Sequence, residues 1–198
     1  HRDLHSFPTR RSSDLGQATQ ISFKVSELSP AVQIPYGKVV VSNGLDECEA
    51  VLDDQGEGSC ELASTSPGEK SLLATYEGSD DHNTSQSVEF VGLIVSKADS
   101  DVSISDFSPE HPVTGQPVTI RFSVIPVAPG WGKPTGTVTI SDGNGRICEA
   151  NIAEDGSGEC QITFEVSGPI TLNAEYAGDD NFNPDTFEGF SSLEIFKA

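Results

Sequence analysis

Four cysteines are the residues of this chain whose type and spacing most clearly indicate chemistry. They form two pairs, Cys48 with Cys60 and Cys148 with Cys160, and the partners of each pair lie twelve positions apart. A Gly-rich turn separates the partners, so a hairpin folded about that turn brings the two sulfur atoms to a distance that a disulfide tolerates. We therefore expect two disulfides and an oxidising compartment, with free thiols or bonds between chains as the alternative.

Two loops rich in aspartate are the second candidate. Asp80 and Asp81 lie in one loop and Asp179 and Asp180 in the other, each time after a Tyr-x-Gly motif. Calcium binds carboxylate and amide oxygens, so these four aspartates are calcium candidates, and no other cofactor is expected. The favoured interpretation is structural: the acidic residues form a turn after a core strand, and Tyr176 anchors that turn through its buried ring and its hydroxyl.

The single tryptophan, Trp131, is a candidate for ligand contact. It lies in the Pro/Gly-rich segment 128–134 between two expected strands. An exposed indole in such a loop can stack on a sugar ring or on a partner protein. The alternative is that Trp131 covers one end of its domain. The corresponding segment of the first half, 29–36, has no tryptophan, so a ligand function common to both halves cannot depend on this residue.

Catalysis has no support in the sequence. Outside the first fifteen residues the histidines are His82 and His111, and they occupy unmatched positions in the two halves of the chain. The chain contains no G-x-S-x-G, H-E-x-x-H or phosphate-loop motif. It also lacks the C-x-x-C spacing of redox sites and the close Cys/His doublets of zinc sites. We expect a protein that is not an enzyme.

An internal repeat of about a hundred residues places all these candidates. The segment from Gln17 to Ala98 matches the segment from Gln116 to Ala198, including the cysteines, the Tyr-x-Gly motif and a final Lys-Ala. A repeat of this length is a whole small domain, which makes the chain part of a tandem array. We expect one repeat at 16–97 and a second at 98–198, with neighbouring repeats of the same chain as partners.

Period-two alternation of apolar residues predicts strands throughout both repeats. It places Val118, Ile120, Phe122 and Val124 on one face, as it does Ile21, Phe23 and Val25 in the first repeat. Further strands are expected at 101–107, 136–141, 147–152, 159–166, 170–176 and 191–196. Asp-Gly and Asn-Gly turns separate them, and about seven short strands per repeat predict an all-β fold of two tandem antiparallel β-sandwiches.

Three motifs of the second repeat resemble those of the bacterial immunoglobulin-like repeat found in large secreted and surface proteins. They are the strand 136–143 ending in Asp-Gly, the Gly-Ser-Gly hairpin at 156–158 and the Tyr-Ala-Gly-Asp-Asp-Asn-Phe run at 176–182. The first repeat keeps the same motifs more loosely. The resemblance implies two immunoglobulin-like domains at a bacterial cell surface, but it implies no particular ligand.

Residues 5–15 resemble one translated reading frame of a short-read sequencing adapter, and residues 3–4 resemble the tail of another copy. We interpret residues 1–15 as an adapter-like artefact, with a genuine basic arm as the alternative. The strand expected at 101–107 has its equivalent at 2–8, inside this segment. The first repeat is therefore expected to lack its authentic opening strand, which leaves a sheet edge unpaired or paired with foreign sequence.

The formal net charge of −20 bounds the partners. Nucleic acids and anionic membranes attract basic patches, so neither is an expected partner, and no run of eighteen apolar residues predicts membrane insertion. We expect an extracellular or cell-surface location and a non-catalytic spacer, in particular an adhesin stalk that presents other domains. The alternatives are a module that binds a glycan or a host or matrix protein directly, and an accessory domain of an extracellular hydrolase.

Overall fold

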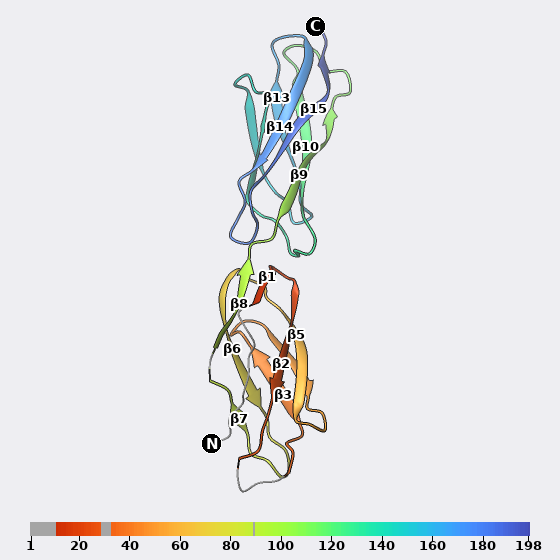
Figure 1. The fold of residues 1–198 in the computed structure, drawn as a ribbon. Coiled ribbons are helices and arrows are strands. Elements are labelled where there is room, and N and C mark those ends of the chain that lie inside the picture. The colour runs from red at the N-terminus through yellow and green to blue at the C-terminus, as the bar shows by residue number, and fades with distance from the viewer. Residues whose placement is uncertain (1–10, 29–32, 89) are drawn as a thin grey trace. The chain divides into compact units, whose positions relative to one another are not determined.

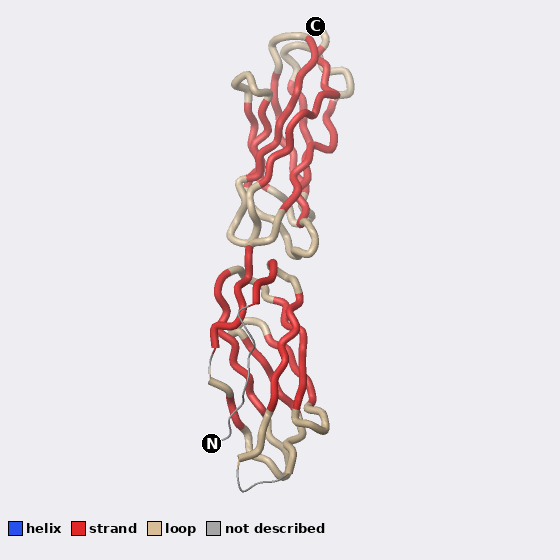
Figure 2. The backbone as a smooth tube through the Cα atoms, viewed as in Figure 1, coloured by secondary structure: helices blue, strands red, loops and turns tan. Residues whose placement is uncertain are grey.

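The computed structural model describes residues 11–28, 33–88 and 90–198 (Figure 1). The chain divides into two compact units, unit 1 at His1–Ser96 and unit 2 at Lys97–Ala198. The boundary lies one residue before the position expected from the repeat. Within the described residues every regular element is a β-strand and none is a helix (Figure 2), which confirms the predicted all-β class.

Unit 1 consists of two sheets. One has the strand order β1-β8-β6-β3-β4, with the short β7 on β6, and the other has the order β2-β5. The bounds of these strands are β1 Arg11–Asp14, β2 Ala18–Lys24, β3 Lys38–Ser42, β4 Glu47–Val51, β5 Glu57–Ala63, β6 Gly68–Tyr76, β7 Ser85–Gln86 and β8 Phe90–Ser96.

Unit 2 has a similar arrangement of two sheets. Its sheets have the orders β12-β11-β14-β15 and β13-β10-β9. The bounds are β9 Ser100–Ser108, β10 Pro117–Pro126, β11 Thr137–Ser141, β12 Ile147–Asn151, β13 Ser157–Thr163, β14 Gly168–Tyr176 and β15 Asp185–Ile195. The strand β9 lies beside β10 and has no described counterpart in unit 1.

The alternation predicted for β2 and β10 determines the core of each unit. Phe122 is 1% exposed and its neighbours along β10 alternate between buried and open positions. Full burial of an aliphatic or aromatic side chain contributes roughly 1.5–3 kcal/mol, so one face of this strand alone is a large part of the folding free energy. Gly158 makes room for the Phe122 ring, because a Cβ atom at this glycine would lie 2.2 Å from that ring. Gly58 does the same for Phe23.

Two elements differ most from the expected strands. β15 starts at Asp185, six residues before the predicted start at 191, because its pairing with β14 passes through two bulges. Each bulge shifts the inward side of the strand, so the sequence of this segment has no continuous period of two.

The second difference is β1, which lies within the adapter-like segment. Arg11–Asp14 pairs in parallel with β8, and Leu15 is buried in unit 1. Main-chain pairing accepts many side chains, so a strand here leaves the origin of residues 1–15 a prediction. The opening strand expected at 2–8 falls outside the described residues.

Candidate functional site

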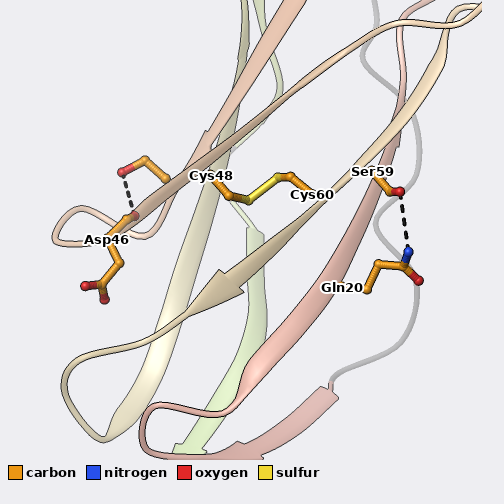
Figure 3. Close-up of a disulfide and its surroundings, with 6 residues drawn as sticks. Gln20, Asp46, Cys48, Ser59 and Cys60 are labelled. Atoms are coloured by element: carbon orange, nitrogen blue, oxygen red, sulfur yellow. Dashed lines mark hydrogen bonds between the residues drawn. A yellow bond between two sulfur atoms is a disulfide. The ribbon is translucent and has the colours of Figure 1, made fainter. Parts of the chain in front are cut away.

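The structure joins Cys48 to Cys60 and Cys148 to Cys160, with S–S distances of 2.05 and 2.08 Å. Figure 3 shows the bond crossing from the strand that carries Cys48 to the strand that carries Cys60. Cys48 lies on β4, at the end of one sheet, whereas Cys60 lies on β5 in the other sheet. Each disulfide therefore links the two sheets of a sandwich along one edge.

Ladder bonds hold both ends of this link in place. Cys48 pairs with Val41 of β3, and Cys60 pairs with Ile21 of β2. Beside the bond, Gln20 donates a hydrogen bond to the Ser59 hydroxyl, and the Ser42 hydroxyl donates to the Asp46 carbonyl (Figure 3). The surroundings are those of a structural crosslink.

Loops at one end of unit 2 bring together several predicted residues. We call this region the Trp131 end and define it by residues 97–100, 127–136 and 178–185. Ala98 lies at its centre, fully buried, with its amide donating to the Asn181 carbonyl and its own carbonyl accepting from the Asn183 amide. The Lys97 ammonium donates to the main-chain carbonyl of Asp179. The Lys-Ala dipeptide is therefore an integral part of unit 2.

Asp179 holds two of these loops together. One carboxylate oxygen accepts hydrogen bonds from the amide and the hydroxyl of Thr135, at 2.8 and 2.6 Å. The other accepts from the amides of Asn181 and Phe182, both at 2.7 Å. Burial alone would raise the pKa of Asp179, but these four donors outweigh it and hold the pKa below its ordinary value. The same balance lowers the pKa of Asp46 in unit 1 and of Asp142 in unit 2.

These lowered pKa values predict acid sensitivity. A carboxyl whose pKa is lower in the folded than in the unfolded state stabilises the fold above its unfolded pKa, near 4, and that stabilisation is lost as the pH falls through the folded pKa. We expect Asp179→Asn to lower the free energy of unfolding at pH 7. The difference in this free energy between the variant and the parent chain should become smaller below about pH 4. Urea unfolding at a series of pH values measures this difference. An equal difference at pH 3 and pH 7 would contradict the claim that the charged Asp179 carboxylate stabilises unit 2.

Trp131 lies on the outer side of this end and is 72% exposed. Its loop is fixed from below, since the Val127 amide donates to the Asp99 carbonyl and the Gly130 amide to the Val127 carbonyl. A Cβ atom at Gly130 would lie 2.5 Å from the Cβ of Ala98, so a glycine lets the loop rest on the Lys-Ala dipeptide. The alternative that Trp131 covers its domain is not what the structure shows, because Phe182 fills the interior position, fully buried beneath the loop.

The two tyrosines of the repeated motif differ in their hydroxyl groups. Both rings are fully buried, as expected. The Tyr76 hydroxyl donates to the Tyr36 carbonyl, but the buried Tyr176 hydroxyl has no hydrogen-bond partner. Burial, and next the charge of Asp179, raise the pKa of Tyr176. The expectation that Tyr176 anchors its turn through the hydroxyl is therefore wrong, and the main-chain and Asp179 bonds hold that turn instead.

The remaining calcium candidates do not converge on one point. Asp80, Asp81 and Asp180 are exposed, and a carboxylate oxygen of Asp81 accepts a hydrogen bond from the Tyr36 hydroxyl at 3.2 Å. In the part of the chain that the structure describes, no three His, Cys, Asp or Glu side chains are grouped closely enough to hold a metal ion. Calcium binding at these loops stays a prediction.

His82 takes the place in unit 1 that Phe182 has in unit 2. It is buried, with its Nε2 3.0 Å from the Gln33 carbonyl and its Nδ1 3.2 Å from the Ser79 hydroxyl. A buried ring thus supports the same turn in both units, once by polar and once by apolar contacts. The motif itself signalled this position, but the importance of Ala98, Thr135 and Phe182 to the Trp131 end was missed.

Unit 1 has a cavity among its described residues. It is an open groove of about 440 Å³ over β2 and β5, lined by Ser22, Phe23, Lys24, Asp53, Glu57, Gly58 and Ser59. Lys24 and Glu57 form an exposed ion pair across it, at 3.1 Å.

No described helix is long and apolar enough to cross a membrane.

Several solved structures are similar to this chain. Among solved structures, invasin, described as a bacterial integrin-binding protein, matches with a TM-score of 0.52 at 17% identity, over 96% of this chain and 39% of invasin. The adhesin InvE of Yersinia pseudotuberculosis matches with a TM-score of 0.46 at 10% identity, over 98% of this chain and 58% of InvE. A two-domain fibronectin type III segment of chicken tenascin matches with a TM-score of 0.42 at 13% identity, over 96% of this chain and 95% of the segment.

These similarities have defined limits. At such identities they concern the fold alone, and the chain spans less than two thirds of invasin and of InvE. No curated protein matches the chain in sequence. The family model described as bacterial Ig-like domain (group 3) matches residues 105–191, within unit 2. This match agrees with the resemblance that the sequence motifs indicated: residues 105–191 are similar to the bacterial Ig-like domain of group 3.

Proposed function

We propose that the two units are a non-catalytic spacer segment of a bacterial secreted or cell-surface protein, of the kind that forms an adhesin stalk. Their task is mechanical: each disulfide-linked sandwich adds its own length between an anchor and a domain presented at a distance. Two observations support this proposal, namely the way in which the chain passes from one unit to the next and the match to bacterial immunoglobulin-like domains.

The junction is the observation that carries the proposal. The Ser96 carbonyl accepts a hydrogen bond from the Leu15 amide of unit 1, and the next residue, Lys97, already donates to Asp179 of unit 2. The units are thus consecutive along the chain with no free residue between them. Folded units that follow one another directly along the chain suit a protein whose function is to add reach by repetition.

The spacer proposal predicts that length increases with the number of repeats. Chains with two, four and six units are expected to gain an equal increment in maximum dimension for each added pair, because each pair contributes its own folded length. Small-angle X-ray scattering measures this dimension. As a control, ten Gly-Ser residues inserted between Ser96 and Lys97 should broaden the distribution of distances. A maximum dimension that stays constant as units are added would refute the proposal.

Direct binding is the second candidate function, and the exposure of Trp131 is the observation that favours it. A rigid loop that presents an indole is suited to a sugar ring or a protein partner. Calorimetric titration with glycans and matrix proteins separates the two functions. The spacer proposal expects no saturable binding by the parent chain, whereas binding that is abolished by Trp131→Ala and retained by Ile147→Ala, at an exposed site outside the Trp131 end, would establish a binding module.

A further inference from the structure

The two units differ at one edge of the sheet that contains β2 or β10. In unit 2, β10 lies between β13 and β9. In unit 1 the equivalent β2 pairs with β5, and no strand within the described residues pairs with its other edge, which we call the outer edge of β2. The equivalence is set by register, since Ile21 pairs with Cys60 as Ile120 pairs with Cys160.

The chain reaches this edge by the same turn in both units. Gln17 and Gln116 occupy the same position after the turn, and each amide donates to the carbonyl of the residue three positions earlier. Each glutamine side chain also accepts a hydrogen bond from the amide of that earlier residue, at 3.0 Å in unit 1 and 3.2 Å in unit 2. β9 ends at Ser108, eight positions before Gln116. The same spacing before Gln17 corresponds to position 9 of the sequence.

The side chains along the edge also correspond. In unit 2, Val102 of β9 lies opposite Val124, and Ile104 lies opposite Phe122. Val102 and Ile104 are both buried, and they are the contribution of β9 to the core. In unit 1, Phe23 of β2 is equivalent to Phe122, and Val25, directly after β2, is equivalent to Val124. Unit 1 therefore has the same apolar pair at the equivalent positions of β2, and both side chains are buried.

A buried hydroxyl marks the same place from the opposite sheet. In unit 2, a carboxylate oxygen of Asp185 accepts a hydrogen bond from the amide of Val102, at 2.8 Å. The equivalent residue of unit 1 is Ser85, since Ser85 pairs with Tyr76 as Asp185 pairs with Tyr176. The Ser85 hydroxyl is buried and has no hydrogen-bond partner. A buried polar atom without a partner is costly, and a strand placed like β9 would bring an amide to it.

The sequence of residues 1–9 lacks the pattern of β9. Counted from the shared turn, Asp3 and His5 stand at the positions of Val102 and Ile104. Pro8 stands at the position of Phe107 and has no amide hydrogen to donate to a ladder. This segment therefore has no apolar side chain at the two positions that correspond to Val102 and Ile104.

We propose that the outer edge of β2 is the acceptor site for an antiparallel strand of the same chain, with the pattern of β9, in place of residues 1–9. The strand takes the register that β9 has on β10, which sets its two aliphatic residues opposite Phe23 and Val25. The amide of the first aliphatic residue faces Ser85. The site binds main chain along its length and selects for aliphatic side chains at two positions, as in strand addition to a sheet edge.

A graft tests the proposal in the full chain. In the grafted chain, residues 1–9 are replaced by SDVSISDFS, the sequence of β9. The control graft, SDDSDSDFS, has aspartate at the two aliphatic positions, so it has the same length and keeps every backbone amide. Neither graft changes a residue of β1–β8, and the fluorescence of Trp131 in unit 2 reports whether the rest of the chain remains folded.

Amide hydrogen exchange of β2 is the measurement. The Val25 amide donates to Gly56 on the β5 side, and successive residues of a strand face opposite edges, so the amides of Gln20, Ser22 and Lys24 face the outer edge. We expect exchange at these three amides to be about tenfold or more slower in the grafted chain than in the control graft. Ser85→Asp should slow exchange further in the grafted chain and have no such effect in the control graft.

Two outcomes would overturn the proposal. Equal exchange at the three amides in both grafts would mean that the outer edge does not select for the pattern of β9. Slower exchange together with a dimer in light scattering would mean that the edge accepts the strand of a second copy instead of its own. A monomeric grafted chain with protected outer-edge amides supports the proposal.

Discussion

Replacing Cys148 and Cys160 together by alanine is expected to lower the free energy of unfolding of unit 2 by about 3 kcal/mol. The chain-entropy estimate sets this value, because the bond spans a sequence separation of 12 and its removal lets the unfolded segment explore many more conformations. Typical domain stabilities are roughly 5–15 kcal/mol, so the loss is a large fraction of what holds a small sandwich together. Guanidinium unfolding followed by the fluorescence of Trp131 measures it in unit 2.

The repeat provides a matched control for this experiment. Cys48 and Cys60 make the same link between the sheets of unit 1, so their joint replacement should leave the Trp131 transition unchanged. Exposing the parent chain to dithiothreitol should reproduce the loss seen in the alanine variant. A variant without Cys148 and Cys160 that unfolds at the parental denaturant concentration would show that the bond contributes nothing to stability.

Phe182→Ala is expected to destabilise unit 2 by roughly 3–5 kcal/mol. The ring is fully buried beneath the Trp131 loop, and Gly132 packs against it: a Cβ atom at Gly132 would lie 3.3 Å from the ring. Removal of the ring leaves a cavity under the Trp131 loop. Main-chain hydrogen bonds and Asp179 hold this loop in place, so it cannot move inward to fill the cavity. Thermal unfolding monitored by circular dichroism measures the change.

Trp131→Ala is the control for this second variant. Trp131 lies on the same loop but is 72% exposed, so its removal should change stability by about 0.5 kcal/mol or less. Phe182→Leu keeps an apolar side chain in the cavity, so its loss of stability should lie between those of Phe182→Ala and Trp131→Ala. Equal destabilisation by Phe182→Ala and Trp131→Ala would mean that the loop, and not the buried ring, holds this end of unit 2 together.

Most of the strands could be predicted because a strand has a period of two whatever surrounds it. The alternation along β10 shows in the sequence which side chains face the core, and the structure buries those same residues. β15 was placed too late because two bulges interrupt its pairing with β14. β1 was not anticipated as an element, since Arg11–Asp14 has no apolar alternation and forms its ladder through main-chain groups alone.

The acidic loops show where local reasoning reaches its limit. Asp179 and Asp80 lie in the two copies of the same motif, at positions that differ by one. From the sequence alone, both are candidate oxygen ligands for a cation. In the structure Asp179 has four donors, two of them from Thr135, which lies 44 residues away along the chain. The role of this carboxylate depends on a loop that no nearby residue specifies.

The all-β class, the division into two repeats, the inward faces of the main strands and the family resemblance could all be recognised in the amino-acid sequence. These features follow from the pleat of the backbone, from the spacing of the cysteines and from similarity between the halves, all of which are local or periodic. The packing of the folded chain was needed to show that Lys97 and Ala98 are built into unit 2, that Trp131 is exposed above Phe182 and that Asp179 joins two loops. Those contacts join segments up to about eighty residues apart, and side chains acquire such partners only when the strands between them have packed into sheets.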